Sequence, residues 1–135
     1  LEPAPMAASS ADYSYDCHWT SGAPAQIPTA PIIRAVVEDL LQGTAPALIS
    51  ARFHLTLVRL FTDLCDHLRR DTGLTRVVLS GGVFQNAILL GGLVRALEDK
   101  KFKVYTHTQV PTNDGGLSLG QAIIAATTAT RSQIA

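Results

Sequence analysis

The chain has 135 residues, enough for one domain with a hydrophobic core, and 47% of them are apolar. Its 11 basic residues balance 11 acidic ones, so composition argues against a nucleic-acid partner recognised through overall charge. No apolar run of about 18 residues predicts a membrane span, and the first residues lack the basic-then-apolar pattern of a signal peptide. Cys17 and Cys65 lie far apart and outside any CxxC pair. We therefore expect free thiols in a reducing cytoplasm, although a disulfide between them stays open.

The first 28 residues are expected to form an irregular N-terminal segment. It begins with a stretch rich in Ala, Pro and Ser, and the alternating aromatics of residues 12–19 indicate one short strand. A helix is predicted to begin after Thr29, because a hydroxyl cap followed by the early Pro31 satisfies free N–H groups and presets φ. Apolar residues then recur at helical spacing until Gly43.

The rest of the chain alternates helices with strands. A second Thr–Pro pair predicts a long helix that ends before a glycine, and the residues after the last helix form a tail. The predicted elements are a helix over 47–70, strands over 76–80 and 102–107, helices over 86–100 and 117–129, and a tail over 128–135. This α/β order implies parallel pairing, with ligands at the carboxyl ends of the strands. At most three strands make a small sheet, so part of the parent fold is expected to be missing.

The last two predicted strands, over 76–80 and 102–107, are each followed by a pair of glycines. Because the carboxyl ends of parallel strands meet at one edge of a sheet, the two glycine pairs are expected to lie close together, which favours a ligand site. Gly81 and Gly82 would let a phosphate or ribose approach main-chain N–H groups at a helix N-terminus. Asn86, one turn further on, could offer its amide to a sugar or phosphate oxygen. A plain turn between strand and helix is the alternative interpretation.

Asp114 places a carboxylate just before the terminal helix. By itself this position predicts an N-cap more readily than a metal ligand, because one Asp cannot hold a metal and no local partner is visible. The four histidines form no HxxH or HxxxH pair, and His54 lies on the long helix, where a structural histidine is the default interpretation. From these residues alone, the chain is an α/β lobe with a nucleotide-binding edge and no defined chemistry.

Three blocks resemble the C-terminal end of HypF, a family of hydrogenase-maturation carbamoyltransferases. They are ARFH at 51–54, LSGGVFQN at 79–86 and VPTNDGGLSLGQA at 110–122. The similarity covers roughly residues 29–127 and includes the spacing between the blocks. The last two blocks also resemble, more remotely, tRNA threonylcarbamoyltransferases and antibiotic O-carbamoyltransferases. The resemblance implies an actin-like, sugar kinase and Hsp70 fold, in which two related lobes close over a nucleotide and residues 29–127 form the C-terminal lobe.

The resemblance also implies a reaction and a site. Carbamoyl phosphate and ATP would give carbamoyl adenylate, whose carbamoyl group passes to the C-terminal cysteine of a partner, HypE, on the way to the cyanide ligand of a NiFe hydrogenase. Matched position by position, Gly81, Gly82 and Asn86 would contact the nucleotide. Asp114 would bind a divalent or ferric ion (zinc, iron or magnesium) that polarises the carbamoyl carbonyl. His54 belongs to a family block, but the resemblance implies no role for it.

Several parts of the family pattern are absent from this sequence. The metal-binding HxxxH pair and a second aspartate belong to the first lobe, and the acylphosphatase-like and activating domains are also missing. We therefore expect the isolated chain to be inactive, to bind metal weakly and to self-associate, most simply as a homodimer, because its sheet edges lack partners. Two alternatives stay open: an O-carbamoyltransferase acting on a small molecule, and a non-catalytic assembly or docking fragment.

Overall fold

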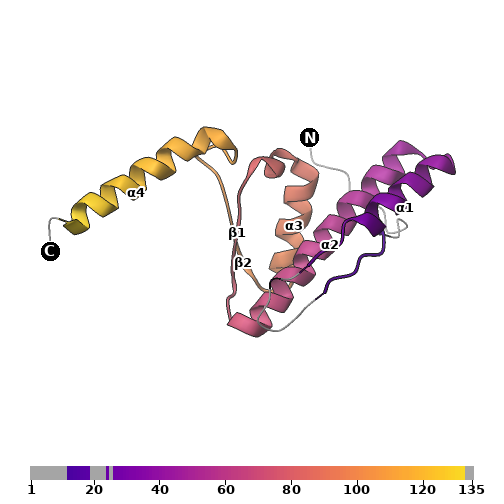
Figure 1. The fold of residues 1–135 in the computed structure, drawn as a ribbon, viewed down its shortest axis with the longest axis horizontal. Coiled ribbons are helices and arrows are strands. Elements are labelled where there is room, and N and C mark those ends of the chain that lie inside the picture. Colours follow the sequence, from indigo (N-terminus) through magenta and orange to yellow (C-terminus); the bar gives the residue numbers. More distant parts are fainter. Residues whose placement is uncertain (1–11, 19–23, 25, 133–135) are drawn as a thin grey trace.

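The computed structural model describes residues 12–18, 24 and 26–132 (Figure 1). This part of the chain has the predicted α/β order and is helix-rich, with a small parallel sheet. The elements are α1 (Ala30–Leu41), α2 (Pro46–Thr72), β1 (Arg76–Leu79), the 3₁₀ helix η1 (Gly82–Gln85), α3 (Ala87–Asp99), β2 (Lys103–Thr106), the 3₁₀ helix η2 (Asp114–Gly116) and α4 (Leu117–Ser132). Among the described residues, none of these helices has the length and hydrophobicity that a membrane crossing requires.

The strand predicted over residues 12–19 is wrong for the part of it that the structure describes. Residues 12–18 contain no strand, and only an isolated antiparallel bridge joins His18 to Gln26. The aromatic side chains are anchored on helices instead. The main-chain N–H of Tyr13 donates to Thr56 Oγ1 (2.8 Å), and its hydroxyl donates to Asp39 (2.8 Å). Burial, together with the Asp39 carboxylate, raises the pKa of Tyr13 to about 12.

The helix starts are where the prolines predict them, but the predicted hydroxyl caps do not form. Thr29 is itself in the right-handed helical region and its side chain makes no cap hydrogen bond. The hydroxyl of Thr44 donates to Asp39 instead (3.3 Å). Asp39 also pairs with Arg52 at 2.8 Å, which joins α1 to α2 and lowers the pKa of Asp39. At its other end, α2 stops at Gly73 in the left-handed conformation, as the sequence predicts.

The main core lies between α2, α3 and the sheet. Its buried members come from β1, from one face of α3 and from the residue before β2: Leu79, Leu89, Leu93, Leu97 and Phe102. The two helices approach closely at Gly92, where an added Cβ would lie 2.8 Å from Val58 Cγ2. A glycine in the middle of α3 therefore allows the helix to sit against α2.

Within the part of the chain that the structure describes, the two-stranded sheet is covered on one face only. β1 and β2 pair in parallel, with Leu79 opposite Thr106 at the carboxyl ends of the strands. α3, backed by α2, covers the face that carries Leu79, whereas Val78 and Tyr105 on the other face are 67% and 41% exposed. Figure 1 shows α4 extending away from the sheet and the other helices. α4 also runs to Ser132, so most of the tail predicted over 128–135 is helical; residues 1–11 and 133–135 lie outside the described residues.

Candidate functional site

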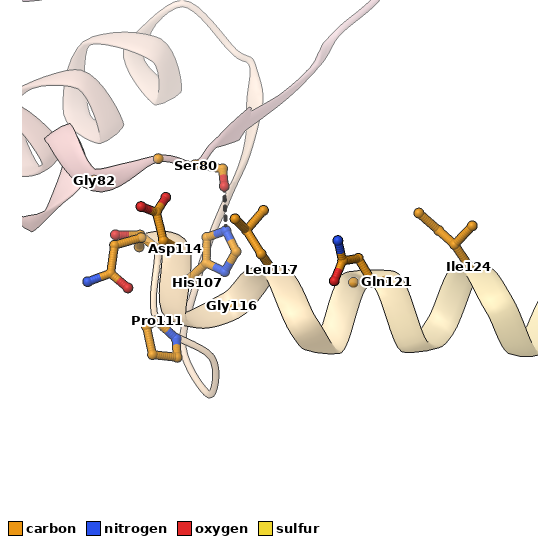
Figure 2. Close-up of a pocket in the computed structure, with 13 residues that line it drawn as sticks. Ser80, Gly82, His107, Pro111, Asp114, Gly116, Leu117, Gln121 and Ile124 are labelled. Atoms are coloured by element: carbon orange, nitrogen blue, oxygen red, sulfur yellow. Dashed lines mark hydrogen bonds between the residues drawn. The ribbon is translucent and has the colours of Figure 1, made fainter.

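A pocket of about 360 Å³ opens at the carboxyl ends of β1 and β2. Its walls are residues 80–82 after β1, His107 and residues 111–114 and 116 after β2, and the first turns of α4 (Figure 2). The loops are joined by a main-chain hydrogen bond in which Gly81 N–H donates to Thr112 O (2.9 Å). The structure thus brings the two predicted glycine pairs to one edge of the sheet, in the place where parallel sheets usually bind ligands.

The two glycines after β1 are there for different reasons. Gly81 has φ +110°, a conformation that residues with a Cβ rarely adopt. Gly82 has no positive φ, and a Cβ added there would have Asn113 Cβ, at 3.9 Å, as its nearest contact outside its chain neighbours. A plain turn therefore accounts for the glycine at 81. It does not account for the glycine at 82, which faces the pocket.

Asp114 is not the cap that its position suggested. Asn113 caps η2, and its side-chain oxygen accepts from Gly115 N–H (3.0 Å). The carboxylate of Asp114 makes no hydrogen bond or ion pair within the described residues. Figure 2 shows it on the pocket side of η2, pointing toward the Gly82 turn. A free carboxylate at this point fits one ligand position of a cation site.

The described residues do not complete a metal site around Asp114. No cluster of three or more His, Cys, Asp or Glu side chains that could hold a metal ion occurs among them. A metal at Asp114 would therefore need further ligands from elsewhere.

Cys17 and Cys65 are free thiols rather than a disulfide, and burial raises the pKa of each.

A hydrogen-bonded pair of side chains in the pocket was not found from the sequence. Ser80 and His107 are the next positions beyond the Leu79–Thr106 pair of the register, so they lie side by side. Ser80 Oγ is 2.8 Å from His107 Nε2. Nearby, the Thr112 hydroxyl oxygen is buried and has no partner among the described residues. The sequence does contain the information needed to predict this pair. When RVVLS and KVYTH are aligned as parallel strands, Ser80 and His107 stand opposite each other.

Asn86 is the one predicted nucleotide contact that does not line the pocket. It lies at the far end of η1 and caps α3, its Oδ1 accepting from the N–H groups of Ile88 and Leu89 (both 3.1 Å). Its amide nitrogen is 2.8 Å from His54 Nε2. Asn86 thus lies outside the pocket lining that contains Gly82 and Asp114, and one of its amide hydrogens has no partner among the described residues.

A family model described as "Carbamoyltransferase, Kae1-like Domain, second subdomain" matches residues 1–121. The chain belongs to this HypF-type family. Carbamoyltransferase HypF2 of Cupriavidus necator is 39% identical over 90 residues, which cover 67% of this chain and 11% of that protein. The HypF-type subdomain thus spans a small part of the curated relatives it matches.

A solved structure and a relative from another carbamoyltransferase family agree with this assignment. A crystal structure of full-length HypF in the phosphate- and nucleotide-bound form superposes with a TM-score of 0.83 and 42% identity, covering 91% of this chain and 16% of that one. A tRNA N6-adenosine threonylcarbamoyltransferase of Methylobacillus flagellatus is 34% identical over 80 residues, or 58% of this chain and 24% of that protein. Both the HypF resemblance and the fold class predicted from the sequence are confirmed.

Proposed function

We propose that this HypF-type subdomain supplies the nucleotide- and metal-contacting lobe of a carbamoyltransferase. The observation that carries the proposal is the pocket at the carboxyl edge of the sheet, where Gly82 is a glycine that the fold does not need and Asp114 a carboxylate that no cap uses. Membership of a carbamoyltransferase family supports the reaction class. The relative whose structure was solved with phosphate and nucleotide supports a nucleotide as ligand.

In this proposal the parent enzyme releases phosphate from carbamoyl phosphate and pyrophosphate from ATP as it forms carbamoyl adenylate. The carbamoyl group then passes to the C-terminal cysteine thiol of HypE, with AMP as the leaving group, during hydrogenase maturation. The Gly81–Gly82 turn lets the nucleotide approach the main chain beside the start of η1. Asp114 would supply one ligand to a zinc, iron or magnesium ion, and further ligands would be needed from outside the described residues, which hold no group of three or more metal-binding side chains. When bound, such an ion would supply Lewis-acid polarisation of the carbamoyl carbonyl. The two free thiols suit the reducing cytoplasm where we place this reaction.

The replacement Asp114→Asn tests the proposal in a full-length HypF polypeptide that carries this chain. The change removes the charge that a cation requires but leaves the cap on Asn113, so the variant should fold normally and lose most carbamoyl transfer. Asp99→Asn is the matched control, since Asp99 is an exposed carboxylate at the end of α3 and outside the pocket lining. Transfer would be measured as carbamoylation of a HypE-type acceptor ending in cysteine. If Asp114→Asn and Asp99→Asn transfer equally well, Asp114 is not part of the site.

A further inference from the structure

His54, in the family block ARFH, joins two elements that are distant in the sequence. Its Nδ1 lies 2.8 Å from the main-chain oxygen of Ser50, one turn earlier in α2, and its Nε2 lies 2.8 Å from the amide nitrogen of Asn86. A carbonyl oxygen can only accept, so Nδ1 must carry the hydrogen. Nε2 is then the acceptor, and the Asn86 amide donates to it. Both partners thus select the same neutral tautomer of His54.

The other end of the Asn86 side chain is also committed. Its Oδ1 accepts from two N–H groups in the first turn of α3, those of Ile88 and Leu89. Exchanging the amide oxygen and nitrogen would place a donor against those two donors and an acceptor against Nε2 of His54. Only one orientation of Asn86 satisfies all three hydrogen bonds. His54 and the N-terminus of α3 together hold this side chain in place.

Asn86 in turn fixes the segment that leads to the pocket. Asn86 directly follows η1, and its main-chain N–H donates to Val83 O (3.1 Å). η1 begins at Gly82, which lines the pocket. The 27-residue helix α2, which carries His54, packs along α3 and is anchored in the core. Phe84 of η1 packs against the same core, and the contact between His54 and Asn86 adds a polar link from α2 to the pocket turn.

We propose that His54 is a positioning residue for the Gly81–Gly82 turn and for the nucleotide that binds it. His54 touches no part of the pocket, and its function is to hold Asn86, and with it η1, in a single position. This inference rests on the proposed function for its ligand, an adenine nucleotide. The positioning itself does not depend on that ligand. It also gives a role to the one family block that the pocket does not include.

Two replacements of His54 test the inference. In His54→Gln, the side-chain carbonyl can accept from Asn86 as Nε2 does, whereas His54→Leu keeps apolar bulk and removes the acceptor. We expect His54→Leu to shift the NMR signals of the Asn86 side-chain amide and of the Gly81 and Gly82 main-chain amides. His54→Gln should leave these signals near their wild-type positions. ADP affinity should fall about three- to tenfold in His54→Leu, the effect of one net hydrogen bond, and recover in His54→Gln.

A third variant breaks the same contact from the other side. Asn86→Ser retains a good N-cap for α3 but has no amide to donate to His54, so its Gly81 and Gly82 signals should move as in His54→Leu. This variant keeps the test decisive if the leucine variant fails to fold. Unchanged glycine signals in a folded His54→Leu or Asn86→Ser variant would overturn the inference. If the signals move as expected but the wild-type protein binds no ADP, the positioning inference stands and the proposed nucleotide site fails.

Discussion

Replacing Gly82 by alanine separates the two explanations for the glycine pair after β1. Gly82 has no positive φ, and the added Cβ would meet its nearest contact, Asn113 Cβ, at an ordinary van der Waals distance of 3.9 Å. Where a backbone conformation is compatible, Gly→Ala stabilises a protein by about 0.4–1 kcal/mol, because the unfolded chain loses conformational freedom. The free energy of unfolding should therefore stay the same or rise slightly.

The ligand should respond in the opposite direction. If a nucleotide approaches the main chain at this turn, the new methyl group occupies part of its place, and affinity should fall at least about tenfold, or about 1.4 kcal/mol. Gly82→Val should have a larger effect. Gly81→Ala is the control for strain, since φ is +110° there and the variant should lose about 1–3 kcal/mol of stability whether or not a ligand binds.

The assay pairs calorimetric titration with ADP, in a full-length HypF polypeptide carrying this chain, with chemical denaturation of the same variants. A stable Gly82→Ala variant with unchanged ADP affinity would refute the reasoning. The glycine at 82 would then be incidental, and the plain-turn interpretation of the whole motif would stand.

The remaining predictions concern packing, pH and assembly. Gly92→Ala should destabilise the protein by about 1–3 kcal/mol, since the Cβ would lie 2.8 Å from Val58. At Gly91 an added Cβ meets no atom within 4 Å, so Gly91→Ala should instead raise the free energy of unfolding by about 0.5–1 kcal/mol. If urea denaturation gives both variants the same change in the free energy of unfolding, Gly92 does not pack against Val58 as described. The pKa of the Asp39 carboxyl is below its usual 3.8 in the folded state. The ionised carboxylate therefore stabilises the fold above pH 3.8, and this stabilisation is lost as the pH falls through the lowered pKa. In Asp39→Asn, the free energy of unfolding should depend less steeply on pH in this acid range. Sedimentation should show the isolated chain self-associating as concentration rises, and a zinc titration should show only weak binding, because one carboxylate supplies too few ligands. A monomer at high concentration, or tight stoichiometric zinc binding, would contradict this last expectation.

The sequence predicts the order and type of the main elements because the signals are local. The apolar periodicity that marks α3 comes from leucines that are buried in the structure, and Gly73 ends α2 through its own backbone conformation. Errors arise where a side chain has a more distant partner. Tyr13 suggests a strand by its pattern but is bound to α1 and α2, and Thr44 resembles a cap but donates to Asp39.

In the candidate site, too, the sequence predicts features set by neighbouring residues and misses contacts between residues that are distant in the chain. The sequence places Gly82 and Asp114 at one edge, because parallel strands end together. It cannot show that only Gly81 needs its unusual φ, or that Asn113 takes the capping role and leaves Asp114 free. The contact of His54 with Asn86 spans 32 positions in the chain and becomes visible only when α2 packs against α3.

The most direct test of the account is a crystal structure of a full-length HypF polypeptide carrying this chain, grown with ADP and a zinc salt. The account predicts the nucleotide against the Gly81–Gly82 turn and a metal ion with Asp114 among its ligands. A structure in which the nucleotide binds elsewhere, and in which Asp114 contacts neither metal nor ligand, would contradict the proposal that this pocket is the site of carbamoyl transfer.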